Sequence, residues 1–278
     1  MLDHAARAKG IGGSELAAIL GLDPYRTPLD VWFEKTGRRP RFDGNEATFR
    51  GQVIEDAVGA YMERALGDQW KKLPTGLHVH PDYPWMLGHP DRLFYNKKTG
   101  ERKGGELKTT IERIEMDDLT DPDNPKKLPW LFQCQWYMAL TGASTYELGW
   151  IGPYFNYQQV TIEYNQNLVD YLIEFVGEWW ERHIVRDEQP DPINASDALL
   201  LWPVDNGESF DASPELMRTI ESFQNFKALA KMNGDMADDL ADRIKLAFGP
   251  CSEVRHDGKR VATFKTDKRG IKSLRVSQ

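Results

Sequence analysis

Cysteine is scarce in this sequence, with only Cys134 and Cys251 among 278 residues. Two cysteines so far apart in the chain indicate neither a disulfide framework nor a cysteine-ligated metal cluster. Long apolar runs are missing too, and the first residues lack the apolar core of a signal peptide. We therefore expect a cytoplasmic protein that makes no contact with a membrane.

An excess of positive charge is also missing, because 35 Lys and Arg residues stand against 43 Asp and Glu residues, a formal net charge of −8. Nonspecific DNA binding draws largely on cationic contacts with phosphate, so this charge disfavours an open DNA-binding surface. The same net charge is compatible with a protein that encloses DNA, because such a protein needs only a local cationic lining. A phosphate-binding loop of the GxxxxGK[ST] type is absent, so ATP hydrolysis is not indicated.

Helical and extended patterns both occur, and a 40% apolar content with nine tryptophans indicates a folded globular protein. Helix-start signals and apolar periodicity predict helices at 15–20 (capped by Ser14), 28–35, 45–66, 130–141, 166–185 and 214–248, the last interrupted at Asn233-Gly234. Alternating patterns predict strands at 77–80, 92–95, 105–109, 146–151 and 155–162, and a C-terminal hairpin turning at 256–259.

A polar segment with two prolines, Pro190 and Pro192, is the best domain boundary in the chain. Proline breaks helices and central strands alike, so regular structure should stop there. We expect a first domain over residues 1–189. Residues 190–278 then form a C-terminal extension of helix and hairpin, available for assembly or partner binding.

Two acids and a lysine, Asp91, Glu106 and Lys108, form the most informative group in the sequence. A lysine- and glycine-containing turn separates them, so we predict a hairpin that brings Asp91 toward Glu106. Residues two apart in a strand share a face, which places Glu106 beside Lys108 and Leu107 on the opposite face. Carboxylates about 5 Å apart repel by roughly 3 kcal/mol, so they favour a cation between them, and their oxygens suit Mg²⁺ or Mn²⁺. This pattern favours metal-assisted hydrolysis of a nucleic acid, against the simpler interpretation of a solvated Glu106–Lys108 pair.

Glu55 is a third candidate acid, three residues before the apolar Val58 on the predicted helix 45–66. That spacing turns it toward the core, where a buried carboxylate needs a partner such as a metal or Lys108. The alternative is a first-turn glutamate favoured by the helix dipole.

Two further groups could contact DNA. Arg7 with Gly12, Gly13 and Ser14 could bind a phosphate through a guanidinium, a hydroxyl and main-chain N–H groups, although an ordinary Ser14 helix cap also explains the pattern. Gln133 and Gln135 lie two residues apart on a predicted helix, so they point in different directions and we expect one of them to reach a central site.

These pieces, in this order, resemble the phage YqaJ-type recombinase family, related to lambda exonuclease within the PD-(D/E)XK nuclease superfamily. The resemblance covers about residues 5–185 and is carried by five segments: Arg7 with 11–15, 51–55, 89–91, 106–108 and 133–135. It implies an α/β fold with a mixed sheet flanked by helices. It also implies an exonuclease, of phage or prophage origin in a bacterial host, that resects double-stranded DNA from a 5′ end and leaves a 3′ tail. A homotrimeric ring and a single-strand annealing protein as partner are further implications.

From the residues and the resemblance together, we predict that Asp91 bridges two Mg²⁺ ions, with Glu106 and the Leu107 carbonyl at one and Glu55 at the other. Lys108 would orient or help to deprotonate the attacking water, while Arg7 and Ser14 hold the 5′ phosphate. The alternatives are a structure-specific endonuclease and a noncatalytic DNA-binding or assembly module.

Overall fold

The computed structural model describes residues 9–40, 44–114, 119 and 128–277. The chain divides into two compact units, Met1–Val204 and Asp205–Gln278, which are described separately below. The boundary expected after Gln189 falls inside the first unit. The segment beyond the prolines is held there because the buried Asp197 accepts a 2.8 Å hydrogen bond from the Thr27 hydroxyl.

Three of the longer helices of the first unit begin at polar capping residues. Thr27, Asn45 and Asn165 each accept a hydrogen bond from the main-chain N–H three residues ahead, which satisfies a donor that has no partner inside the helix. The elements are η1 (Gly13–Glu15), α2 (Leu16–Ile19), α3 (Pro28–Lys35), α4 (Glu46–Leu66), α6 (Leu128–Thr141), α7 (Gln166–Trp179), the π-helical η2 (Trp180–Val185) and α8 (Ala195–Leu201). None of the helices in the described ranges combines the length and apolar character needed to cross a membrane.

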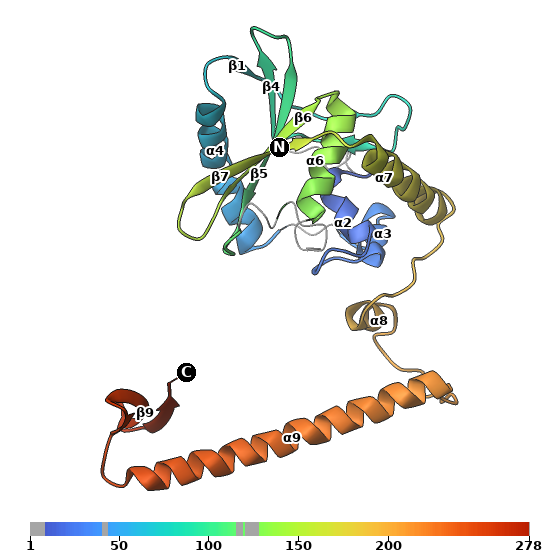
Figure 1. Ribbon diagram of the computed structural model, residues 1–278. Coiled ribbons are helices and arrows are strands. Elements are labelled where there is room, and N and C mark those ends of the chain that lie inside the picture. The colour runs from blue at the N-terminus through green and yellow to red at the C-terminus, as the bar shows by residue number, and fades with distance from the viewer. Residues whose placement is uncertain (1–8, 41–43, 115–118, 120–127, 278) are drawn as a thin grey trace. The chain divides into compact units, whose positions relative to one another are not determined.

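A five-stranded sheet runs through the first unit in the order β1-β4-β5-β6-β7 (Figure 1). Its strands are β1 (Trp70–Leu73), β4 (Arg92–Asn96), β5 (Arg102–Thr109), β6 (Thr145–Ile151) and β7 (Tyr157–Glu163), and a separate short pair joins β2 (His78–Val79) to β3 (Leu87–Gly88). Strands β5 and β6 are parallel, whereas the other neighbours in the large sheet are antiparallel. The mixed sheet flanked by helices confirms the predicted α/β fold.

The two faces of the sheet carry different packing clusters, with α4 on one side and α6 on the other (Figure 1). Leu107 of β5 belongs to the smaller cluster, together with Val58 and Met62 of α4. Tyr146 and Trp150 of β6 belong to the larger cluster on the α6 side. Because neighbouring residues of a strand alternate between faces, Glu106 and Lys108 project on the α6 side.

Most predicted elements are confirmed, including the β4–β5 hairpin and the helices from 28, 45 and 166. Two expectations are wrong. Ser14 does not cap the first helix, because Gly12 stands at the cap and its N–H donates to Glu15 at 2.9 Å. Helix α9 (Pro214–Phe248) continues through Asn233-Gly234 without the predicted interruption. The C-terminal hairpin turning at 256–259 is confirmed, and a third strand is added to it.

The second unit consists of α9 followed by a small antiparallel sheet of β8 (Glu253–His256), β9 (Lys259–Thr266) and β10 (Lys272–Val276), ordered β10-β9-β8. The end of α9 contacts this sheet through Phe248 and Phe264, whose rings lie 5.7 Å apart. Pro214 at the first helical position and the Ser213 cap explain where α9 begins.

Gly104→Ala should destabilise the first unit. A Cβ atom at Gly104 would lie 1.7 Å from the ring of the fully buried Tyr146, directly across the β5–β6 pair. Overpacking of this kind costs about 1–3 kcal/mol or more, so the thermal midpoint should fall by several degrees. Gly76→Ala is the matched control, since a Cβ there meets nothing within 4 Å. Equal midpoints for the two variants in a calorimetric scan would contradict this packing.

Candidate active site

Glu106 and Lys108 lie side by side on β5. The Lys108 ammonium is 2.7 Å from Glu106 Oε1, and the Glu106 side chain is buried with 2% of its surface exposed. The Lys108 side chain keeps 22% of its surface exposed, so its amine lies where the buried acid meets solvent. The predicted strand spacing therefore produces the expected pair, and the pair is more buried than a solvated surface ion pair.

Asp91 approaches this pair from the start of the partner strand. Arg92 pairs with Gly105 in the β4–β5 register, and beyond that pair Asp91 Oδ2 accepts the Leu107 N–H at 2.9 Å. The N–H and C=O of one residue in a strand point toward the same side. The Leu107 carbonyl therefore lies on the edge of β5 that Asp91 occupies.

Glu55 reaches the same region from α4, with 42% of its side chain exposed. Its Oε1 is 3.6 Å from the Arg92 guanidinium, which also donates to Asp56 at 3.1 Å and to the Asp91 carbonyl at 2.9 Å. Glu55 is half-buried rather than fully turned into the core. It stands in the middle of α4, so the alternative of a first-turn glutamate favoured by the helix dipole is wrong. Burial raises the pKa of Glu55, and the negative charge of Asp91 adds to the increase.

The three acids are electrostatically coupled. Burial and the charge of Asp91 raise the pKa of Glu106 to about 8, with a further increase from Glu55, while Lys108 acts in the opposite direction. A carboxyl group with so high a pKa gains much from any additional cation. The structure thus brings Glu55, Asp91 and Glu106 close enough to influence one another's charge.

Lys108 keeps its proton. Burial lowers its pKa, but the negative charges of Glu106 and Asp91 more than offset that effect, so the pKa rises above the ordinary value. The ammonium also donates to Gln133 Oε1 at 2.9 Å, and the Gln133 amide donates to the Tyr137 hydroxyl at 3.3 Å. Gln133 on α6 therefore holds Lys108 in place beside Glu106.

The two glutamines face different parts of the protein, as their helical spacing predicts. Gln135 donates to the Glu163 carbonyl at 2.8 Å and accepts the Asn165 N–H at 2.9 Å, so it connects α6 to the start of α7. Of the pair, Gln133 is the one bonded to Lys108.

The expected phosphate pocket is described only in part. Arg7 lies outside the described residues, and Ser14 is exposed on η1. The Gly12 N–H is engaged by Glu15, whose carboxylate also pairs with Lys35 at 2.8 Å. That N–H is therefore not available to an anion in this arrangement, whereas the Ser14 hydroxyl is accessible.

The donor set fits a hard divalent cation. Glu106 Oε2 is buried and finds no hydrogen-bond partner in the described part of the chain, and carboxylate oxygens are the ligands that Mg²⁺ and Mn²⁺ prefer. Within the described ranges, no three His, Cys, Asp or Glu side chains stand close enough together to form a complete metal-binding group. The carboxylates are instead held by cations and a main-chain donor: Glu106 by Lys108, Glu55 by Arg92 and Asp91 by the Leu107 N–H.

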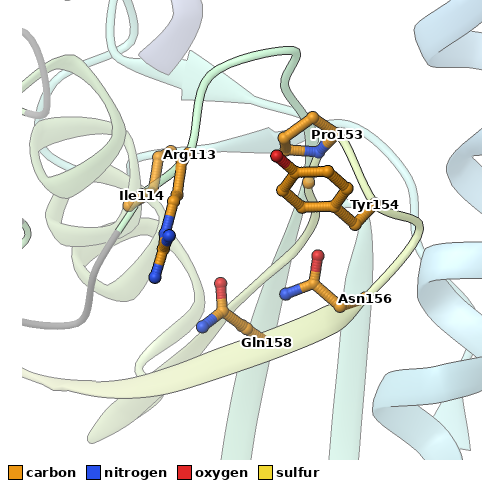
Figure 2. A pocket seen from close by; sticks show the side chains of 7 residues that line it. Arg113, Ile114, Pro153, Tyr154, Asn156 and Gln158 are labelled. Carbon is orange, nitrogen blue, oxygen red and sulfur yellow. The ribbon is translucent and has the colours of Figure 1, made fainter. Parts of the chain in front are cut away.

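A cavity of about 300 Å³ opens at the end of the sheet where β5 and β6 terminate (Figure 2). Arg113 follows β5 on one side, and Tyr154 follows β6 on the other (Figure 2). Between them lie Asn156, just before β7, and Gln158, near the start of β7. Because β5 and β6 are parallel, this is the end toward which Lys108 lies. A guanidinium, a phenol and two amides can all contact a nucleotide.

Arg92 is the site residue that sequence reasoning missed. Its side chain is 8% exposed, and the guanidinium lies within 4 Å of Glu55, Asp56 and Glu63, all on α4. The sequence held a clue to this role, because Glu55, Asp56 and Glu63 stand at positions i, i+1 and i+8 of α4 and so share one helix face. A cluster of acids on one face, around the small Gly59, favours a cation packed against it. A Cβ at Gly59 would lie 2.4 Å from that guanidinium.

Known proteins resemble this chain in both sequence and fold. The family described as YqaJ-like viral recombinase domain matches residues 4–144. An uncharacterized protein, YqaJ of Bacillus subtilis (strain 168), is 26% identical over 250 residues, which cover 86% of this chain and 75% of that protein. The crystal structure of an alkaline exonuclease, LHK-Exo from Laribacter hongkongensis, matches with a TM-score of 0.51 and 19% identity over 66% of this chain and 91% of that one. The same enzyme in complex with dAMP gives a TM-score of 0.52 with the same coverage. At 19% identity, these two structures establish a similarity of fold and nothing more.

Proposed function

The chain belongs to the YqaJ-like viral recombinase family, and from this membership we propose that it is a divalent-metal-dependent exonuclease acting on DNA. More specifically, we propose that Mg²⁺ supports its activity and that it degrades linear double-stranded DNA from the 5′ end, leaving 3′ single-stranded tails for recombination by strand annealing. The observation that carries the proposal is the buried Glu106 carboxylate, paired with Lys108 and electrostatically coupled to Asp91 and Glu55.

Asp91, Glu106 and Glu55, with the carbonyl of Leu107, are the groups that would hold the metal. A bound divalent cation lowers the pKa of water and offsets negative charge on the leaving oxygen. The buried Glu106 supplies a carboxylate in a region of low dielectric, where its interaction with a cation is strong. Arg92 positions Glu55 through its guanidinium and Asp91 through the main-chain carbonyl.

Lys108 would act as a fixed ammonium group. Its raised pKa keeps the proton on Nζ, so the amine donates a hydrogen bond to the attacking water or to a phosphate oxygen. Lys108 Nζ also donates a hydrogen bond to Gln133, which restricts the direction in which the ammonium group points. This arrangement favours orientation and charge stabilisation over proton abstraction by Lys108. Gln135, by contrast, supports the α6–α7 connection, and we assign it no contact with DNA.

The fold likeness to an alkaline exonuclease crystallised with dAMP supports the same reaction class. A nucleoside monophosphate is the unit released when an exonuclease removes one residue from a strand end. The cavity beside Tyr154 and Gln158 is a candidate contact for the nucleotides next to the cleaved bond.

The decisive experiment is digestion of a linear duplex that carries separate labels at its 5′ and 3′ ends. With Mg²⁺, release of the 5′ label as a mononucleotide should precede loss of the 3′ label, and chelation of the metal should stop both. A covalently closed circular duplex is the control. Cleavage of the circle would favour a structure-specific endonuclease, and an intact linear duplex with Mg²⁺ or Mn²⁺ would favour a noncatalytic DNA-binding module.

Arg7→Ala should selectively reduce the preference for 5′-phosphorylated ends. We propose that Arg7 and the exposed Ser14 hold the 5′ phosphate, since a guanidinium and a hydroxyl both donate to phosphate oxygens. The initial rates on duplexes with and without a 5′ phosphate should become nearly equal in this variant. Lys9→Ala removes a neighbouring cation and serves as the control. Equal loss of rate on both kinds of end would argue against a phosphate pocket at Arg7.

We further propose a homotrimer that encloses the duplex and a single-strand annealing protein as partner. A ring would explain how a chain with a net charge of −8 remains on DNA, because enclosure replaces electrostatic affinity. Light scattering coupled to size exclusion should then give three times the 31.9 kDa chain mass. A monomer mass at micromolar concentration would oppose the ring.

A further inference from the structure

The C-terminal sheet has a charge opposite to that of the rest of the protein. Strands β8–β10 and their turns, residues 253–276, contain eight Lys and Arg residues and three acids, a formal net charge of +5. The remaining chain has 27 basic and 40 acidic residues, a net charge of −13. Such an asymmetry within one chain indicates a basic segment that serves a polyanionic ligand.

Carboxylates inside the sheet neutralise a part of this charge. Glu253 pairs with Arg255 at 2.6 Å and lies 3.8 Å from Lys265, and Asp267 pairs with Arg269 at 3.1 Å. The hydrogen bond from Arg255 and the charges of Arg255, Lys265 and Arg260 lower the pKa of Glu253. The Glu253 carboxylate therefore offsets the charge of several cations.

Five exposed cations remain outside these pairs, and one of them, Lys272, lies over the Phe264 ring. Lys259, Arg260, Lys268 and Arg275 form no ion pair with any described residue of this unit. Arg260 also stands directly opposite Arg255 in the β8–β9 register. Like charges directly opposite each other destabilise a strand pair, so a bound anion would relieve this arrangement.

Packing does not require these basic side chains. The interior of the sheet is small: Ala262 is buried, Phe264 contacts Phe248, and Leu274 lies beside Phe264 in the register. Lys272 lies over the Phe264 ring at 4.3 Å, whereas the other four cations project from exposed positions. These four side chains therefore do not contribute to the packed core of the unit.

We propose that the three-stranded sheet β8–β10 is a DNA-binding module that contacts the phosphate backbone through Lys259, Arg260, Lys268 and Arg275. The choice of DNA over an acidic protein rests on the proposed function, because DNA is the polyanion that the nuclease must retain and that the rest of the chain repels. The contacts are made to phosphates, so binding is independent of sequence and depends strongly on salt.

The test compares the full-length protein with a variant in which these four residues are changed to Gln. Fluorescence anisotropy with a labelled duplex and a labelled single strand of equal length, in EDTA so that no cleavage occurs, gives the affinity at several salt concentrations. Each duplex phosphate contact contributes about 0.9 to the slope of log affinity against log salt, so four lost contacts should reduce it by roughly three to four. Affinity at 100 mM salt should fall by about tenfold or more. The form of DNA that loses more affinity is the form that the sheet holds.

Helix α9 offers a matched control with the same change of charge in the same unit. Arg218, Lys227, Lys231 and Arg243 are all exposed, and changing these four to Gln should leave the slope unchanged. Lys259→Arg with Lys268→Arg keeps the charge and should bind as the native protein does. Equal losses in the α9 and sheet variants, or no loss in the sheet variant for either DNA, would overturn the inference and leave the sheet as a surface for another partner.

Failure of the proposed function gives a different result. If the native protein leaves the end-labelled duplex intact with Mg²⁺ while the sheet variant loses its salt slope, the DNA-binding module stands and the exonuclease does not. If the native protein digests the duplex and the sheet variant keeps the native slope, the exonuclease stands and the module is rejected.

Discussion

Lys108→Ala is expected to reduce the turnover number for DNA cleavage by about 10²–10⁴-fold, the range associated with a positioned proton-transfer or charge-stabilising group. The ammonium lies 2.7 Å from Glu106 and 2.9 Å from Gln133, so alanine removes a donor whose position is fixed from two sides. DNA binding without metal should change little, because one partly exposed cation contributes little to the total affinity. Single-turnover cleavage and anisotropy measured on the same preparation separate these two effects.

Lys71→Ala is the matched control for this prediction, since Lys71 is an exposed lysine of β1 in the same sheet. The fold should survive the change at position 108, because the pKa of Glu106 rises further without its cationic neighbour and the carboxyl group takes up a proton instead of remaining charged. Turnover in Lys108→Ala equal to that of Lys71→Ala would remove Lys108 from the mechanism.

Metal affinity is expected to increase about tenfold per pH unit between pH 6 and pH 8, and then to level off. Burial and the charge of Asp91 raise the pKa of Glu106 to about 8, so below that pH a proton must leave before the carboxylate can bind a cation. Calorimetric titration with Mn²⁺ should thus give a dissociation constant about 100-fold lower at pH 8 than at pH 6. Glu106→Gln should bind Mn²⁺ more weakly and lose the pH dependence.

The same pKa makes a prediction about stability without metal. The folded protein holds a proton on Glu106 at pH values where the unfolded chain has released it, so the free energy of unfolding falls as the pH rises from about 4.5 to about 8. Glu106→Gln should flatten this part of the profile in denaturant titrations. A native profile that rises over the same interval, or that matches the Gln variant, would show that Glu106 is ionised in the folded state at neutral pH.

The sequence was sufficient to predict the hairpin that carries the site. Alternation along residues 92–95 and 105–109, with a turn rich in lysine and glycine between them, fixes which residues share a face, so Glu106 and Lys108 come together while Leu107 packs against α4. Helix boundaries at Thr27 and Asn45 were predictable for a similar reason, because caps are local interactions of a side chain with nearby main-chain N–H groups.

Tertiary contacts explain what could not be predicted. Arg92 looks like an ordinary strand residue, and its role depends on the distance between β4 and α4, which no local pattern specifies. Ser14 resembles a helix cap, but the competing Glu15 carboxylate, held by Lys35 of α3, takes the Gly12 N–H. The first unit extends past Pro192 because Asp197 bonds to Thr27, a contact 170 residues apart in sequence.

The parallel pairing of β5 with β6 also affects the point during synthesis at which the nascent chain can complete the candidate active site. The acids and the amine are complete once residue 108 has been synthesised, but Gln133 and the supporting strand β6 come later. Ribosomes add roughly 5–20 residues per second, and pairing between distant parallel strands is slow to form. We therefore expect nascent chains shorter than 151 residues to have no nuclease activity.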